Sequence, residues 1–236
     1  ADLAEDVDRQ GGLAGARDQQ RDDHIVERHH EGQHGPRHDA GQQQRLAEVV
    51  AERAQRSRAF FAEHAGEFGE QQEQMVAFGV YGPSAAEMLR AAQPEGGELA
   101  IEIGPGEGAF LAELAPRYRQ VIALDNSEAM LAKAQAYVAG QSLDNVRCLL
   151  GDSRSAALPS ATADCVVANM VLHHVPSPAD IFRDAQRLLR PGGVFCVAEL
   201  CPHDQNWARE ACGDLWLGIA PEELNEWAIG SGLEEG

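Results

Sequence analysis

The stretch Glu102-Ile103-Gly104-Pro105-Gly106-Glu107-Gly108-Ala109 joins an apolar run to a helical pattern. Residues 98–103 have the apolar character of a buried strand, and residues 107–115 have helical spacing as far as Pro116. Glycines allow the backbone to turn sharply and let a ligand approach main-chain N–H groups closely. This run therefore indicates a ligand-binding turn between a strand and a helix.

Strands and helices alternate on both sides of this turn. We expect further strands at residues 120–125, 145–152, 164–170 and 194–200, and helices at residues 43–65, 84–92, 128–139, 179–190, 204–217 and 221–231. Residues 74–82, between the first two helices, are predicted to form a loop. Ser84, with Glu87 three residues later, predicts a capping box, and Ser127 is a predicted N-cap. The alternation favours an α/β fold, with a Rossmann-like, doubly wound, mostly parallel sheet and flanking helices.

Composition excludes several classes of partner. The chain has 236 residues and a formal net charge of −19, and phosphate backbones need clustered Lys and Arg, so we expect no direct nucleic-acid binding. No apolar run is long enough to span a membrane, and the first residues lack the pattern of a secretory signal. The 5 cysteines then indicate reduced thiols, and we predict a cytoplasmic protein.

Residues 1–41 differ from the rest of the chain. They contain no aromatic residue and hold His24, His29, His30, His34 and His38. Such a segment buries too little apolar surface to order itself, so we predict a disordered or non-native segment; a metal-binding tract and out-of-frame translation are the alternatives. We therefore divide the chain into residues 1–41, a helical segment at 42–95 and a ligand-binding domain at 96–236.

Taken alone, the glycine-rich turn leaves the ligand open. The pattern Gly104-x-Gly106-x-x-Ala109 also satisfies the dinucleotide fingerprint, and Asp125 ends the next predicted strand, where an acid accepts hydrogen bonds from ribose hydroxyls. A nicotinamide-dependent oxidoreductase therefore stays among the alternatives. Glu102 disfavours it, because a carboxylate there would repel a pyrophosphate but would suit a cationic ligand.

A series of motifs extends along the predicted strands. It comprises E-x-G-P-G-x-G (102–108), the acid at Asp125, Gly151-Asp152, D-x-V-x-A-N-x-V-L-H-H (164–174) and L-L-R-P-G-G (188–193). In this order and spacing, the chain resembles the class I S-adenosylmethionine-dependent methyltransferases. Within this family, the chain looks most like the methyltransferase domains of bacterial ArsR-type regulators, and residues 58–65, which precede the domain, are part of that likeness. It also implies two more strands, so we expect the sheet to be truncated before its last two strands, which leaves a sheet edge unpaired.

The resemblance implies S-adenosylmethionine as methyl donor and a set of binding residues. Glu102 and Asn169 would lie near its amino group, Asp125 near its ribose and Asp152 near its adenine, with Tyr81 covering its methionine part. The full predicted set is Glu102, Gly104, Gly106, Gly108, Asp125, Asn126, Asp152, Ser153, Asn169 and Tyr81.

No catalytic residue or metal ligand is assigned from the sequence. Displacement at a sulfonium releases a neutral thioether, so the protein mainly positions the reactants. We interpret His173-His174 as structural. Cys196, Cys201, His203 and Cys212 could together bind arsenite or a metal, but their spacings match no recognised motif.

These observations predict a methyltransferase that acts on a small-molecule acceptor. The alternative is a non-catalytic module of an ArsR-type regulator that senses S-adenosylmethionine or S-adenosylhomocysteine. No winged helix precedes the domain in residues 1–41, which argues against a DNA-binding role for this chain. A homodimer is one option for its assembly.

Overall fold

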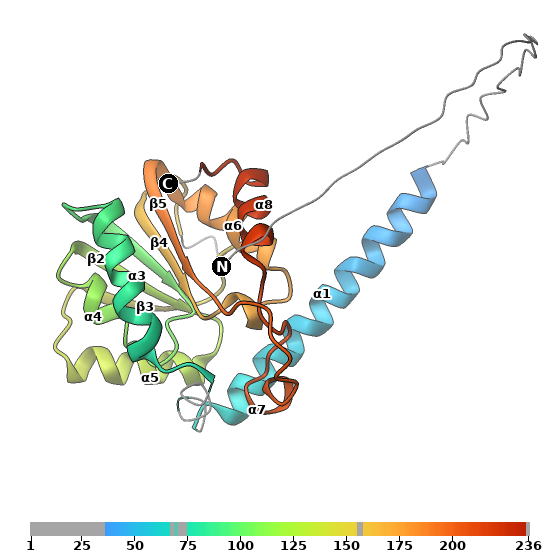
Figure 1. Cartoon of the computed structure of the whole chain (residues 1–236), viewed down its shortest axis with the longest axis horizontal. Coiled ribbons are helices and arrows are strands. Elements are labelled where there is room, and N and C mark those ends of the chain that lie inside the picture. The colour runs from blue at the N-terminus through green and yellow to red at the C-terminus, as the bar shows by residue number, and fades with distance from the viewer. Residues whose placement is uncertain (1–35, 67–68, 70–74, 155–157, 235–236) are drawn as a thin grey trace, which may run out of the picture.

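The computed structural model describes residues 36–66, 69, 75–154 and 158–234. Figure 1 shows a twisted sheet between helices, from which one long helix projects. The strands are β1 (Gly97–Ile103), β2 (Tyr118–Asp125), β3 (Val146–Leu150), β4 (Ala163–Asn169) and β5 (Leu189–Ala198). The helices are α1 (Pro36–His64), α3 (Phe78–Ala92), α4 (Leu111–Leu114), α5 (Glu128–Gly140), η1 (Leu172–His174), α6 (Pro178–Leu188), α7 (Ala208–Ala211) and α8 (Pro221–Gly230).

The order of the strands creates a crevice beside β1. The sheet has the order β3-β2-β1-β4-β5, and each neighbouring pair is parallel. The chain winds outward in one direction through β2 and β3 and then returns to the other side of β1 through β4 and β5. Ligands bind at such a switch point, at the carboxyl ends of the strands. The predicted doubly wound, parallel α/β sheet is therefore confirmed.

The two faces of the sheet are covered by different helices. Ala100 points to a core that includes side chains of α3, α4 and α5. The next residue, Ile101, points to a second core that contains side chains of α6 and α8. This alternation follows from the two-residue period of a strand, and near-continuous apolar sequence is what a sheet buried on both faces requires.

Two predicted helices begin at different residues in the structure. α4 begins at Leu111 rather than at residue 107, because Gly108 has a φ of 94° and cannot belong to a right-handed helix. α3 begins at Phe78, within the stretch predicted as a loop. Ser84 therefore lies inside α3, and its predicted capping role is wrong: the N-cap is Ala77, without a side-chain hydrogen bond.

Two predicted segments near the C-terminus also differ. β5 begins at Leu189 and includes Pro191-Gly192-Gly193, which were predicted to follow a helix; a proline is tolerated in a strand at the edge of the described sheet. Helix 204–217 is reduced to the single turn α7. Ser127 does cap α5, since its side chain accepts a hydrogen bond from the Met130 N–H.

The N-terminal prediction is only partly covered by the structure. The disordered or non-native segment was predicted at residues 1–41; residues 1–35 lie outside the described residues, and residues 36–41 belong to α1. α1 begins at Pro36, before the predicted start at residue 43. The division of the chain at residues 41 and 95 stays a prediction. Among the described helices, none combines the length and the apolar character that crossing a membrane requires.

Candidate functional site

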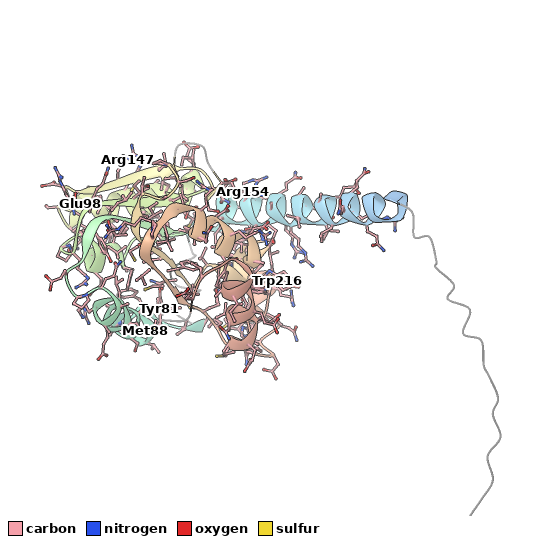
Figure 2. The ribbon with its side chains drawn as sticks, turned by 90° about the horizontal axis from the view of Figure 1, so that it is seen from above. Tyr81, Met88, Glu98, Arg147, Arg154 and Trp216 are labelled. Carbon is pink, nitrogen blue, oxygen red and sulfur yellow. The ribbon has the colours of Figure 1, made fainter. Side chains whose placement is uncertain are left out.

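A cavity of about 250 Å³ opens at the carboxyl ends of the strands. The turn after β1 forms its floor, and residues at the ends of β2, β3 and β4 form one side. Phe61 of α1 and Tyr81 of α3, the latter labelled in Figure 2, contribute from the helical segment that precedes the sheet. The cavity thus lies at the switch point that the strand order creates.

Nine of the ten residues predicted to bind the cofactor line this cavity. The exception is Gly108, where a Cβ would lie 3.3 Å from the Ala134 Cα of α5. Gly108 therefore allows the turn to pack against α5, and the structure places it away from the cavity. Tyr81 lines the cavity from α3 rather than from the predicted loop.

The other two glycines of the turn have distinct roles. Both have a positive φ, 65° at Gly104 and 58° at Gly106. A Cβ at Gly104 would lie 2.3 Å from Val171 Cγ2, so glycine is required there by packing. A Cβ at Gly106 would meet no atom of the described residues within 4 Å, so the backbone at Gly106 borders space that a ligand can occupy.

Glu102 is a buried acid in the cavity wall. Its exposed fraction is 2%, and its Oε2 has no hydrogen-bond partner among the described residues. Burial raises the pKa of Glu102 to about 8. The pKa of Tyr81 is raised to about 12 by burial and by the neighbouring Glu102 charge. A carboxylate in this state gains from a ligand that brings a positive charge and N–H donors.

Asp125 stands at the end of β2, beside the end of β3. Its Oδ1 accepts a hydrogen bond of 2.8 Å from the Ser127 N–H, and its carbonyl oxygen accepts one of 2.8 Å from the Gly151 N–H. Burial raises the pKa of Asp125 to about 6, although the Ser127 and Asn126 N–H groups act in the opposite direction. The side chain is thus oriented by the backbone while it borders the cavity, together with Asn126.

Asp152 and Ser153 follow β3, and they differ in whether their side chains can still bond to a ligand. Asp152 is exposed, and its Oδ1 accepts a hydrogen bond of 3.0 Å from the Arg154 N–H. The Ser153 hydroxyl donates to Asp184 of α6 at 2.5 Å, and the Ser153 carbonyl accepts from Arg187 at 2.7 Å. Ser153 lines the cavity, but its side chain serves to attach the turn to α6.

Asn169 completes the polar part of the wall at the end of β4. It is buried, and its Nδ2 has no hydrogen-bond partner among the described residues. The described lining contains four acids, which are Glu102, Glu107, Asp125 and Asp152, and neither Lys nor Arg. Such a wall attracts a cation and repels a pyrophosphate, so this site fits a nicotinamide dinucleotide poorly.

Several lining residues were not predicted from the sequence. Phe61, Phe78, Val175 and Ile181 are among the apolar side chains that line the cavity. Phe61 belongs to the apolar periodicity of α1, but that periodicity does not reveal that α1 reaches the sheet. The four-residue group of Cys196, Cys201, His203 and Cys212 is not brought together as metal ligands in the described part of the chain.

Comparison with known proteins agrees with this geometry. The family model of a methyltransferase domain matches residues 101–197. An uncharacterized methyltransferase of Mycobacterium tuberculosis is 34% identical over 141 residues, which cover 59% of this chain and 70% of that protein. An uncharacterized 37.1 kDa protein encoded in a transposon of Streptomyces fradiae is 35% identical over 115 residues, 48% of this chain and 33% of that protein. The chain therefore spans about a third of the transposon protein.

Solved structures show the same fold. A methyltransferase of Aquifex aeolicus that depends on S-adenosylmethionine superimposes with a TM-score of 0.53 at 18% identity, covering 64% of this chain and 80% of that protein. A phosphoethanolamine N-methyltransferase of Haemonchus contortus in complex with S-adenosylhomocysteine gives a TM-score of 0.55 at 21% identity, covering 64% of this chain and 36% of that protein.

Proposed function

Because the chain belongs to the class I S-adenosylmethionine-dependent methyltransferases, we propose that its acidic cavity binds the methyl donor beside a small-molecule acceptor and supports methyl transfer between them. When bound, S-adenosylmethionine supplies a methyl group on a cationic sulfur, whose departure as a neutral thioether needs no acid. The observation that carries the proposal is Glu102, a buried acid whose Oε2 has no hydrogen-bond partner among the described residues, in a cavity whose described lining includes neither Lys nor Arg.

The amino group of the donor fits the end of the cavity at β1 and β4. Glu102 Oε2 is a buried acceptor with no donor in the described part of the chain, and the Asn169 side chain is buried beside the same cavity. A buried polar atom without a partner is costly, so a ligand ammonium group that donates to these side chains would stabilise the site. We assign the methionine part of the donor to Glu102, Asn169 and Tyr81.

The nucleoside of the donor fits the ends of β2 and β3. Asp125 is held by the Ser127 N–H and borders the cavity, so its second oxygen can accept from ribose hydroxyls. Asp152 can accept from the adenine amino group, while the Ser153 hydroxyl is engaged by Asp184. We assign Asp125 and Asn126 to the ribose, Asp152 to the adenine, and Gly104 and Gly106 to the backbone floor.

The acceptor fits the apolar part of the cavity. Phe61, Phe78, Val175 and Ile181 line it, and such side chains favour a small molecule with an apolar portion. By excluding water and holding the acceptor against the donor, these residues provide orientation, which can contribute about 7–11 kcal/mol to lowering a barrier. The ArsR-type association, the cytoplasmic location and a homodimer stay predictions.

A binding experiment tests the cofactor half of this proposal. Calorimetric titration with S-adenosylhomocysteine, S-adenosylmethionine and NADH is expected to show binding of the first two and none of the third. Asp125→Asn should weaken S-adenosylhomocysteine binding by about tenfold, because a charged acceptor of two hydroxyl donors is lost. Preferential binding of NADH would contradict the assignment of the site.

A turnover experiment tests the catalytic half. The chain is incubated with methyl-labelled donor and a panel of small acceptors that carry hydroxyl, thiol or amine groups, and S-adenosylhomocysteine release is measured. Acceptor-dependent release supports methyl transfer. Tight binding of both cofactor forms without release for any acceptor would instead favour a sensing module.

A further inference from the structure

A second cluster of polar side chains lies at the rim of the cofactor cavity. His173 and His174 belong to η1, and Asp214 lies in the segment after α7. All three are buried, with exposed fractions of 3%, 6% and 4%. One ligand atom from each residue can be chosen so that all three atoms lie within 4.8 Å of one another. The predicted site includes none of these side chains.

Asp214 is a buried carboxylate that lacks hydrogen-bond donors among the described residues. Neither of its oxygens accepts a hydrogen bond from the described residues. Its neighbours are His174 Nδ1 at 3.6 Å and His173 Nε2 at 4.0 Å, both too long for a hydrogen bond. Arg209, the nearby cation, donates instead to the Leu215 carbonyl at 3.0 Å. A buried carboxylate with so few donors is stabilised by a cation placed next to it.

The backbone holds Asp214 in this place. The Leu215 and Trp216 N–H groups both donate to the His173 carbonyl, at 2.9 and 3.2 Å. Trp216 Nε1 donates to the Val175 carbonyl at 2.8 Å, and the Trp216 ring lies 5.0 Å below the Arg53 guanidinium of α1. Figure 2 shows Trp216 on the C-terminal segment, near the base of α1. The proximity of Asp214 to the two imidazoles is therefore built into the fold.

Glu199 determines which nitrogen of His173 faces Asp214. Glu199 follows β5, and its side chain is 1% exposed. Its Oε1 pairs with His173 Nδ1, and its Oε2 accepts from the Leu172 and His173 N–H groups at 2.8 and 3.2 Å. In the neutral ring with its proton on Nδ1, the lone pair of Nε2 faces the Asp214 carboxylate. Two electron-rich atoms 4.0 Å apart in a buried site are stabilised by a cation between them.

We propose that His173 Nε2, His174 Nδ1 and an oxygen of Asp214 bind a divalent transition-metal ion, with Glu199 as the positioning residue. Two imidazole nitrogens and one carboxylate oxygen are a donor set of zinc and of neighbouring first-row ions. A carboxylate behind a ligand histidine is the usual arrangement at such sites. Tetrahedral zinc separates its ligand atoms by roughly 3.4 Å, so the two measured separations need only a small closure.

The ion would face the methyl-transfer cavity. His174 lines that cavity, so a coordination position not filled by protein would open toward the acceptor. Three protein ligands with an open position are typical of metal sites that bind a substrate atom. The site would thus take an oxygen, nitrogen or sulfur atom of the acceptor. Metal binding itself does not depend on methyl transfer, so the two proposals can fail separately.

Cobalt binding to the chain of residues 1–236 tests the site directly. Co²⁺ is titrated into the wild type, Asp214→Asn and Asp204→Asn after treatment with a chelator, and visible absorption and stoichiometry are recorded. Asp204 is the matched control, since it is an exposed acid ten residues away in the same C-terminal segment. The histidines in residues 1–41 are common to all three proteins, so weak binding there cancels in the comparison.

We expect Asp214→Asn to lose one equivalent of Co²⁺, or to bind it at least tenfold more weakly, while Asp204→Asn matches the wild type. S-adenosylhomocysteine binding and circular dichroism check that each variant is folded. Should Asp214→Asn fail to fold, Glu199→Gln provides the second variant, with an expected loss of 10–100-fold in Co²⁺ affinity. Equal Co²⁺ absorption and stoichiometry in the wild type and in the folded variants would overturn the proposal.

Discussion

The carboxyl ends of β1 and β5 each carry a buried glutamate, but the two side chains have different surroundings. Glu199 accepts hydrogen bonds from the N–H groups of Leu172, His173 and Leu200 and pairs with the His173 ring. Glu102 has no partner for its Oε2 among the described residues. The chain itself satisfies the first carboxylate, which therefore serves the structure. We propose that a ligand satisfies the second.

This difference has opposite consequences for stability and for binding. A buried carboxylate without donors destabilises the free protein, and a bound ligand that donates hydrogen bonds to it offsets this loss of stability. A buried carboxylate with a full set of donors stabilises the fold, and its removal leaves those donors without partners. The four predictions below start from this contrast and run from the largest expected effect to the smallest.

Glu102→Gln should weaken S-adenosylhomocysteine binding by about 100-fold, or about 2.7 kcal/mol, because the ligand ammonium loses its charged acceptor. Calorimetry measures the change. Glu107→Gln is the matched control: Glu107 also lines the cavity, but it is half-exposed and already paired with Lys133 at 2.6 Å. We expect less than a threefold change there. If Glu102→Gln and the wild type bound S-adenosylhomocysteine with similar affinity, the proposed role of Glu102 in binding would be wrong.

Glu199→Gln should lower the free energy of unfolding by about 2 kcal/mol, because an amide cannot accept as many hydrogen bonds as the carboxylate that it replaces. Urea denaturation in the presence of a chelator measures this loss. Glu210→Gln, at an exposed position of α7, should stay within about 0.5 kcal/mol of the wild type. If Glu199→Gln were as stable as the wild type, the proposed contrast between the two glutamates would be wrong.

Affinity for S-adenosylhomocysteine should rise roughly tenfold between pH 6.5 and pH 8. The pKa of Glu102 is about 8 in the free protein, so below this pH binding of a cationic group must first displace a proton. The same raised pKa makes the native state hold a proton that the unfolded chain has released, so this group lowers stability as pH rises from about 4.5 to about 8.

Glu102→Gln should flatten both pH profiles, since glutamine does not titrate. Its unfolding free energy, relative to the wild type, should therefore improve between pH 5 and pH 9. Calorimetry and urea denaturation at several pH values record the two effects. A wild-type affinity that falls as pH rises from 6.5 to 8 would contradict an ionised Glu102 in the complex.

Gly108→Ala should lower the free energy of unfolding by about 1 kcal/mol, because Gly108 has a φ of 94° and a Cβ would press on α5. The affinity of the folded protein for S-adenosylhomocysteine should change less than threefold, since Gly108 does not line the cavity. Gly140→Ala is the control, with no atom near its added Cβ and no positive φ. A large loss of affinity in Gly108→Ala would contradict this prediction and indicate that Gly108 contributes to the binding site.

Helix boundaries were the least reliable sequence predictions, for identifiable reasons. The apolar spacing of residues 107–115 is helical, yet the positive φ of Gly108 delays α4 until Leu111. Residues 204–217 contain enough apolar residues for a helix, but the chain there is held against η1 by hydrogen bonds to the His173 carbonyl. Local propensity is a weak prior wherever tertiary contacts compete with it.

The polar residues that line the cavity could be predicted because they stand at the ends of strands. Glu102, Asp125, Asp152 and Asn169 stand at the ends of consecutive strands, and parallel strands bring those ends to one edge. The His173, Glu199 and Asp214 group could not be predicted. These residues are distant in sequence, and the irregular segment that carries Asp214 follows no motif.

The sequence alone therefore determined the alternation of strands and helices, the parallel sheet and the glycine turn, because these depend on local periodicity and on the conformational freedom of glycine. Tertiary structure decided which acids stay without partners, that α1 and α3 cover the cavity, and that Asp214 meets the two imidazoles. Burial and hydrogen-bond satisfaction are properties of the packed chain, and they separate the carboxylate that we propose to bind the donor from the structural one.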